Sequence, residues 1–129
     1  MEYEVKSEIL GFERMRRVRL GVIDETFASL RDTENENISF TLVNPFALRE
    51  YAVTIPPYVN ALLEIDEGTK LAVYNVVVLQ NPLDESRVNF LAPLIFNQDN
   101  YTMAQAVLKP KEYPEYGMAE SIRSLIKES

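Results

Sequence analysis

Short segments with β-strand character recur along this chain, and polar spacers that favour turns separate them. The spacers fall at residues 32–37, 66–70, 81–87 and 97–101. In the segment 17–23, Val18, Leu20 and Val22 share one face while arginines point the other way, which is the period-2 pattern of a strand with one buried face. Many short strands with turn signals between them are typical of an antiparallel sandwich or a small barrel. We therefore expect a mainly β fold.

Further segments complete the predicted sheet, at residues 39–43, 51–55, 71–79, 88–97 and 103–108. The segments 71–79 and 88–97 are apolar on both faces and rich in β-branched and aromatic residues, as expected of central strands. We expect 103–108 to pair with 88–97 through a turn near residues 97–100. Pro93 has no backbone N–H to donate, so it predicts an edge position or a bulge within 88–97.

Two helices are predicted beside the sheet. Pro57 suits the first position of a helix over 57–65, in which Tyr58, Leu62 and Ile65 share one face. A second helix is expected over 118–127, and it would pack on the sheet or on a partner. Its apolar stripe consists of Met118, Ile122, Leu125 and Ile126. The expected architecture is a single domain over residues 1–129, a small antiparallel β-barrel or sandwich with one short internal helix and a C-terminal amphipathic helix.

Cysteine and histidine are both absent from the 129 residues. Their absence excludes disulfides, thiolate or imidazole metal ligands, thiol nucleophiles and the commonest general base. The four glycines lie far apart, so no glycine-rich phosphate loop is present. We expect no enzyme activity, no metal and no cofactor. A metal-dependent hydrolase built on paired carboxylates, such as Asp24-Glu25, is the enzyme alternative.

The charge balance is acidic, with 13 basic and 20 acidic residues and a formal net charge of -7. Such a protein repels phosphate backbones on average and attracts a basic protein partner. The alternative of a nucleic-acid-binding barrel rests on the cluster Arg14, Arg16, Arg17 and Arg19, with Tyr3 or Phe12 as stacking platforms. We expect instead a solvated strand face and no direct nucleic-acid binding.

The longest uncharged run, residues 71–83, contains 13 residues, against about 20 needed to span a bilayer. Charged residues also alternate through the first eight positions, so no apolar secretion segment is present there. We therefore expect a cytoplasmic protein without membrane contact.

Five short motifs follow one another between residues 9 and 108. They are Ile9-Leu10-Gly11-Phe12-Glu13, Phe40-Thr41-Leu42-Val43-Asn44-Pro45, Val73-Tyr74-Asn75-Val76-Val77-Val78, Asn89-Phe90-Leu91-Ala92-Pro93-Leu94 and Gln105-Ala106-Val107-Leu108, with Tyr113 soon after. This succession resembles the flagellar assembly factor FliW family, in particular its short epsilon-proteobacterial members. The resemblance implies a cytoplasmic, non-catalytic regulator with a β-barrel-like fold. It also implies two partners, the translational repressor CsrA and newly made flagellin, which in effect compete for the protein. The family antagonises CsrA allosterically.

Nine residues are candidates for partner contact, and each also has a structural interpretation. They are Asn44, Pro45, Phe46, Asp66, Glu67, Asp84, Glu85, Ile122 and Leu125. Asn44-Pro45 favours a turn after a strand, whereas Phe46 is either tucked under the barrel or offered to a partner. The acidic pairs lie in predicted turns, where they solubilise the turn or attract basic CsrA. The free protein is expected to be a monomer.

Two asparagines lie in apolar surroundings. Asn75 is in the middle of the most apolar predicted strand, and Asn89 begins the next apolar run. A buried amide without a partner costs about 1–3 kcal/mol, so each should form hydrogen bonds. The favoured interpretation is a bond between strands or one that closes a loop, and the alternative is the floor of a binding groove.

Overall fold

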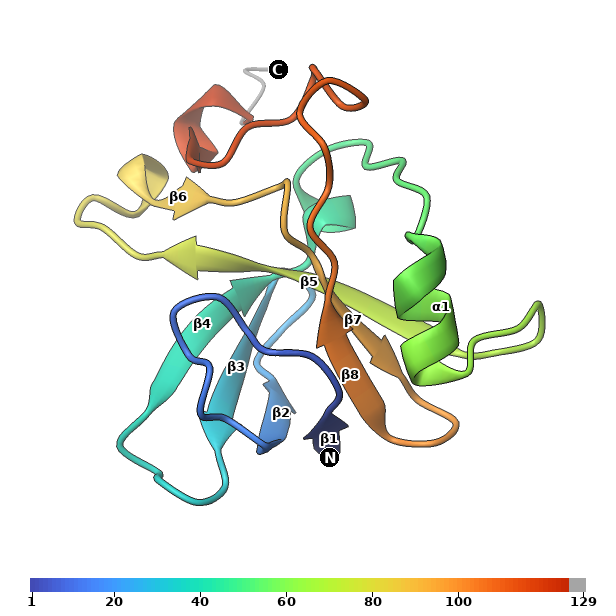
Figure 1. The fold of residues 1–129 in the computed structure, drawn as a ribbon. Helices are drawn as coiled ribbons and strands as arrows, with labels where there is room; N and C mark the ends of the chain where they lie inside the picture. The colour runs from blue at the N-terminus through green and yellow to red at the C-terminus, as the bar shows by residue number, and fades with distance from the viewer. Residues whose placement is uncertain (126–129) are drawn as a thin grey trace.

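Seven strands within residues 1–125, the part of the chain that the computed structural model describes, close into a barrel (Figure 1). They are β1 (Glu2–Val5), β2 (Arg17–Val22), β3 (Phe27–Asp32), β4 (Ser39–Val43), β5 (Leu71–Val78), β7 (Leu94–Asn97) and β8 (Thr102–Gln105). Their order is β4-β3-β2-β1-β8-β7-β5, and pairing of β4 with β5 closes the circle. All pairs are antiparallel except β1 with β8. The prediction of a mainly β fold is confirmed.

A small extension of the sheet projects from the barrel beside the end of β5 (Figure 1). It consists of β6 (Arg87–Val88) and β9 (Glu120–Ser121), which pair with each other, and β6 also pairs with β5. Two short 3-10 helices, η2 (Leu83–Glu85) and η3 (Ile122–Ser124), flank it, and a third, η1 (Pro45–Ala47), follows β4. β6 and β7 both pair with β5, and residues 89–93 between them interrupt the ladder, as Pro93 predicted.

Strand β5 is covered on both faces, because side chains alternate across it. Ala72, Tyr74 and Val76 pack against the cluster inside the barrel, which includes Val18, Leu30, Leu42 and Phe96. Val77 faces a second cluster formed with Val43, Tyr51, Phe90, Tyr116 and Ile122. A third cluster lies under helix α1 (Pro57–Leu63). The doubly apolar pattern of 71–79 is therefore explained by two cores that share one strand.

The segment 51–55 is not a strand, although its composition predicted one. Its backbone N–H groups find tyrosine hydroxyls instead of a neighbouring strand. Ala52 N donates to the Tyr116 hydroxyl at 2.8 Å, and Thr54 N donates to the Tyr113 hydroxyl at 2.9 Å. These bonds give two backbone donors of the segment a partner without a ladder. Two strands of the barrel, β1 and β3, were not predicted.

Helix α1 begins at Pro57 as predicted and ends at Leu63, where Glu64 adopts the left-handed conformation with φ 55°. Its buried side chains are Val59 and Leu63, whereas Tyr58 and Leu62 are exposed. The predicted buried face was therefore wrong by one position. Val59 and Leu63 are four residues apart and pack against Ile95 and Ala104 of the sheet. No helix within residues 1–125 is long and apolar enough to cross a bilayer.

The predicted C-terminal helix does not form over residues 118–125, and Ile126 and Lys127 lie outside the described residues. Glu120 and Ser121 pair with β6 as β9, and the Ser121 hydroxyl accepts a hydrogen bond from Ser124 N at 3.3 Å to begin η3. Strand pairing and this cap supply the backbone partners that a helix would otherwise provide. Ile122 is nevertheless buried, so part of the apolar stripe packs on the body as expected.

Candidate partner-binding site

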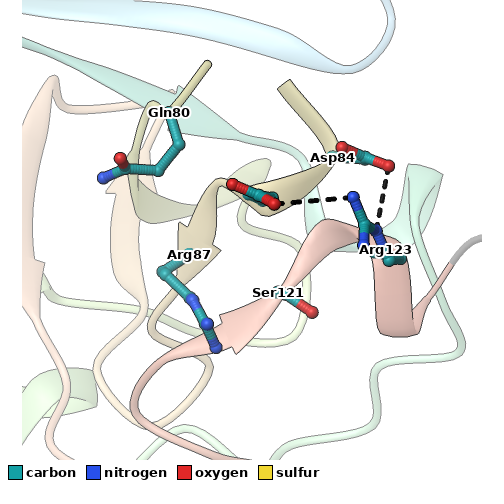
Figure 2. A pocket seen from close by; sticks show the side chains of 6 residues that line it. Gln80, Asp84, Arg87, Ser121 and Arg123 are labelled. Carbon is teal, nitrogen blue, oxygen red and sulfur yellow. Dashed lines mark hydrogen bonds and ion pairs between the residues drawn. The ribbon is translucent and has the colours of Figure 1, made fainter. Parts of the chain in front are cut away.

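Two segments far apart in sequence meet at the extension and form a charged ledge. We define this ledge as the six residues that line a hollow there, Gln80, Asp84, Glu85, Arg87, Ser121 and Arg123. Figure 2 shows Arg123 between the two carboxylates. Its Nε donates to Asp84 Oδ2 at 3.0 Å, and its Nη2 lies 3.6 Å from Glu85 Oε1. One guanidinium from η3 thus holds both acids of η2.

The electrostatics of the ledge follow from this arrangement. The hydrogen bond from Arg123 lowers the pKa of Asp84, because it favours the charged carboxylate. The side chains remain exposed, 61% for Arg123 and 37% for Asp84, so solvent screens the attraction. The predicted acidic pair Asp84-Glu85 is therefore partly neutralised, which weakens its attraction for a distant basic protein.

Exposed apolar side chains lie on the connection from β5 to η2. Val78, Leu79 and Leu83 are 58%, 50% and 52% exposed. Apolar residues with charged neighbours are typical of surfaces that bind other proteins. The other two candidates in this region, Ile122 and Leu125, pack into or against the second core cluster, so they support the ledge from below.

Asn44, Pro45 and Phe46 come together at the end of β4. Asn44 Oδ1 accepts a hydrogen bond from Phe46 N at 3.0 Å and caps η1, and Pro45 is buried. The turn interpretation of Asn44-Pro45 is confirmed. Phe46 is 59% exposed, and its ring meets the ring of Tyr51 edge-on with 6.0 Å between centroids. The aromatic side chain is presented to solvent rather than tucked under the barrel.

Asp66 and Glu67 lie away from the other candidates, in the turn before β5. Asp66 Oδ1 accepts hydrogen bonds from Gly68 N and Thr69 Oγ1, both at 2.9 Å, while Glu67 is exposed. This turn comes before β5 and the ledge comes after it, so the eight residues of β5, which span about 26 Å, separate the two places. The nine candidates thus occupy three places: the end of β4, the ledge with the two core residues beneath it, and this turn.

A buried polar network joins the two interrupted parts of the sheet. Asn75 Nδ2 donates to the Asn89 carbonyl at 2.9 Å, and Asn89 Oδ1 accepts from Leu91 N at 3.0 Å. The predicted loop-closing role of both asparagines is confirmed. Sequence reasoning missed Tyr51, whose hydroxyl donates to the Phe90 carbonyl at 2.6 Å. Burial raises the pKa of Tyr51 to about 12.

Arg49 is a second residue that the sequence did not single out. Its Nη1 donates to both carboxylate oxygens of Glu120 at 3.0 and 3.1 Å. Its guanidinium carbon lies 5.2 Å from the ring centroid of Phe90 and 4.7 Å from that of Tyr116. Arg49 therefore connects the segment after η1 to β9, across 71 positions of sequence.

The structure also bears on the two alternative functions, a metal-dependent hydrolase and a nucleic-acid-binding barrel. Within residues 1–125, no three Asp or Glu side chains converge in a way that could hold a metal ion. Tyr3 is 2% exposed, and Phe12 stacks on Phe40 with 4.6 Å between centroids. Both aromatic platforms of the nucleic-acid alternative are thus engaged in or against the core.

Comparison with known proteins gives one family. The family model described as "FliW protein" matches residues 2–121. The chain is similar to flagellar assembly factor FliW 1 of Wolinella succinogenes, at 52% identity over 99% of this chain and 100% of that protein. It is also similar to flagellar assembly factor FliW of Sulfurimonas denitrificans, at 45% identity over 98% of this chain and 99% of that protein.

The fold also has a solved counterpart. A crystal structure of the flagellar assembly factor FliW superposes with a TM-score of 0.85 over 99% of this chain and 88% of that chain. At 19% sequence identity, this likeness shows the fold.

Proposed function

The chain belongs to the FliW family of flagellar assembly factors, and on that premise we propose that it is a cytoplasmic regulatory protein that binds CsrA and flagellin. Flagellin that accumulates occupies the protein, and CsrA is then free to repress flagellin synthesis. Once flagellin has been exported, the protein binds CsrA again and relieves the repression, without occupying the RNA site of CsrA. The free protein is a monomer of one domain, and its work is binding rather than catalysis.

The observation that carries this proposal is the full-length similarity to flagellar assembly factors in epsilon-proteobacteria. The surface is consistent with it, because large apolar side chains are exposed both beside the ledge and at Phe46. A barrel closed by paired strands supports such residues rigidly, which reduces the entropy lost on binding.

The nine candidates take different parts in this proposal. Phe46, Glu67, Asp84 and Glu85 reach solvent and are proposed as contact residues. Asn44, Pro45, Asp66, Ile122 and Leu125 hold the backbone or the core beneath them and act by positioning those contacts.

The test is a partner-exchange experiment on a sizing column. The purified protein is mixed with CsrA and, separately, with flagellin kept monomeric, and co-elution is measured. Flagellin is then added to the CsrA complex. We expect each binary complex to form and flagellin to release CsrA. If the protein co-elutes with neither, the proposal is wrong.

An additional RNA-binding measurement distinguishes the proposed function from the nucleic-acid-binding alternative. The protein alone is mixed with a flagellin leader RNA at low and at moderate salt. With a net charge of -7, it should retain almost none. Tight retention that falls steeply with salt would favour the alternative instead.

A further inference from the structure

Residues 51–55, which run from η1 towards α1, have the character of a strand but no neighbouring strand (Figure 1). Tyr51, Val53 and Ile55 pack in or against the core clusters, whereas Ala52 and Thr54 are exposed, which is the period-2 alternation of a strand. Ile55 also precedes a proline, a position that favours extended backbone. We call residues 51–55 the unpaired segment.

One side of the unpaired segment is occupied by tyrosine hydroxyls. Ala52 N and Thr54 N donate to the hydroxyls of Tyr116 and Tyr113, so alternate N–H groups of the segment are satisfied by the same part of the chain. In an extended chain, the N–H and carbonyl groups of the intervening residues point to the opposite side. The backbone groups of Val53, and of its neighbours at positions 51 and 55, are therefore directed away from the tyrosines.

The opposite side has no backbone partner. Among residues 1–125, no hydrogen bond involves the backbone N–H or carbonyl of Tyr51, Val53 or Ile55. Buried backbone groups without partners are rare in folded proteins, so these groups face solvent. They form a row of three donor–acceptor pairs, one at every second residue and about 6.8 Å apart.

This row of backbone groups lacks the features that usually protect the edge of a sheet. Proteins cover such edges, close them into barrels or place charged side chains on them. The seven strands of the barrel are closed in this way, because β4 pairs with β5. No charged residue occurs at positions 51–63, and Pro56 begins only after the row ends. The unpaired segment is thus open to pairing.

We infer that the unpaired segment binds an extended segment of a partner protein, which adds to it as a β-strand. The occupant follows from the backbone groups, because N–H and carbonyl groups repeated at every second residue are complementary to another extended main chain. On one face, the partner's side chains lie beside Tyr51, Val53 and Ile55 and extend their apolar packing. The partner segment therefore carries apolar residues at every second position.

The inference rests on the proposed function, which is to bind proteins, and it describes how one of them is held. In this mode of recognition, main-chain hydrogen bonds supply affinity and the alternating side chains supply selectivity. The exposed side chains of Ala52 and Thr54 are small, so they leave room beside the added strand.

Amide hydrogen exchange in the unmodified protein tests the segment without any partner. We expect Val53 and Ile55 to exchange at least about tenfold faster than Ala52 and Thr54, whose N–H groups are bonded. Slow exchange at Val53 and Ile55 in dilute protein would overturn the inference. Exchange that slows at these two residues as the protein concentration rises, together with dimers on a sizing column, would assign the segment to a second copy of this chain and reject a partner protein.

The same measurement is repeated in the complexes with CsrA and with monomeric flagellin. We expect Val53 and Ile55 to become protected about tenfold or more in at least one complex, while Ala52 and Thr54 change little. If every complex that forms leaves both amides in rapid exchange, the inference is wrong although the proposed function stands. If neither complex forms, the proposed function fails and the inference fails with it.

Val53→Pro removes one N–H group of the row, and Val53→Ala is the matched control, because it shortens the same side chain and keeps the N–H. We expect Val53→Pro to weaken binding of the partner that protects Val53 about tenfold or more, and Val53→Ala to stay within about threefold of the unmodified protein. Equal binding by the two variants would contradict strand addition.

Thermal unfolding of the variants separates binding from folding. A proline whose missing N–H faces solvent is tolerated, so Val53→Pro and Val53→Ala should have similar stability. Thr54→Pro, which removes the bond to the Tyr113 hydroxyl, should be less stable than either. If Val53→Pro fails to fold, amide exchange in the complexes of the unmodified protein decides the question.

Discussion

Asn75 and Tyr51 meet inside the protein, where Asn75 Nδ2 lies 3.4 Å from the Tyr51 hydroxyl oxygen. The amide also donates to the Asn89 carbonyl, and the hydroxyl donates to the Phe90 carbonyl. The carbonyls of Asn89 and Phe90, in the break between β6 and β7, thus both have side-chain donors. One donor comes from β5 and the other from the segment after η1. The break in the ladder therefore costs little, because its backbone acceptors are paired.

We predict that Tyr51→Phe destabilises the protein by about 1–2 kcal/mol, since it leaves the Phe90 carbonyl without its donor. The effect depends on pH. Burial raises the pKa of Tyr51 from 10.0 to about 12, so the folded state favours the protonated hydroxyl. This contribution to stability is complete below about pH 10 and is lost as the pH rises towards about 12.

Denaturant unfolding between neutral pH and pH 11 measures both effects. The decline in the free energy of unfolding above pH 10 should be smaller for Tyr51→Phe than for the unmodified protein. A remainder is expected from Tyr3, whose pKa burial also raises. Identical declines in the two proteins would contradict the assignment.

We predict that Asn75→Ala costs about 1–3 kcal/mol, because it removes a buried amide and leaves the part-buried Asn89 carbonyl without its donor. Asn89→Ala is the matched comparison. The Asn89 side chain only accepts from Leu91 N and is partly exposed, so water can replace it and the loss should be smaller. Chemical unfolding of both variants checks the order, and a larger loss for Asn89→Ala would contradict it.

Arg49 should hold the C-terminal segment on the body. Its Nη1 donates to both carboxylate oxygens of Glu120, its Nη2 donates to the Glu115 carbonyl, and its planar group lies against two aromatic rings. A lysine ammonium cannot reproduce this arrangement, so Arg49→Lys should destabilise the protein nearly as much as Arg49→Ala. We expect Arg49→Ala to cost about 1–2 kcal/mol. Hydrogen exchange at Phe90 and Ile122, whose N–H groups bond within this region, should accelerate.

Arg123→Ala is the control for that experiment. Its ion pairs with Asp84 and Glu85 are exposed, and exposed pairs contribute about 0–1 kcal/mol. Equal exchange rates in the Arg49 and Arg123 variants would show that Arg49 is not the principal clamp.

The ledge offers a prediction at acid pH. The pKa of Asp84 is lowered mainly by the hydrogen bond from Arg123, so the carboxylate should stay charged below the ordinary range of an aspartate. The pair contributes stability above the unfolded pKa, and this contribution is lost as the pH falls through the lowered folded pKa. An NMR titration of the Asp84 carboxyl should show the shift, and Arg123→Gln should abolish it. A titration unaffected by Arg123→Gln would remove Arg123 as its cause.

The strands were predictable where apolar and polar residues alternate in the sequence, as in β2 and in residues 39–42 of β4. β3 escaped prediction because small Ala28 and buried Asp32 weaken its alternation, although Leu30 lies in the core. The segment after η1 has strand composition, but distant tyrosine hydroxyls take its N–H groups. No local pattern reveals such partners.

The site shows the same division between local and distant contacts. The Asn44 cap follows from two adjacent residues and was predictable. The apolar spacing after residue 117 favoured a helix, but pairing of β9 with β6 and the bond from Arg49 to Glu120 decide that segment. Those partners lie more than 30 residues away in sequence, so spacing within the segment could not reveal them.

Long-range attraction of a basic partner gives the last prediction. Of the acidic pairs Asp66-Glu67 and Asp84-Glu85, Asp66 fixes a turn and Asp84 accepts the hydrogen bond from Arg123. Reversal is therefore best made at Glu67 and at Glu85, whose ion pair with Arg123 is longer, at 3.6 Å. The double variant Glu67→Lys, Glu85→Lys should bind CsrA more slowly at low ionic strength and with a flatter salt dependence. At 0.15 M salt the screening length is about 8 Å, so the difference should largely vanish. Stopped-flow association rates across a salt series measure this, and rates unchanged at every salt concentration would show that these carboxylates do not steer the partner.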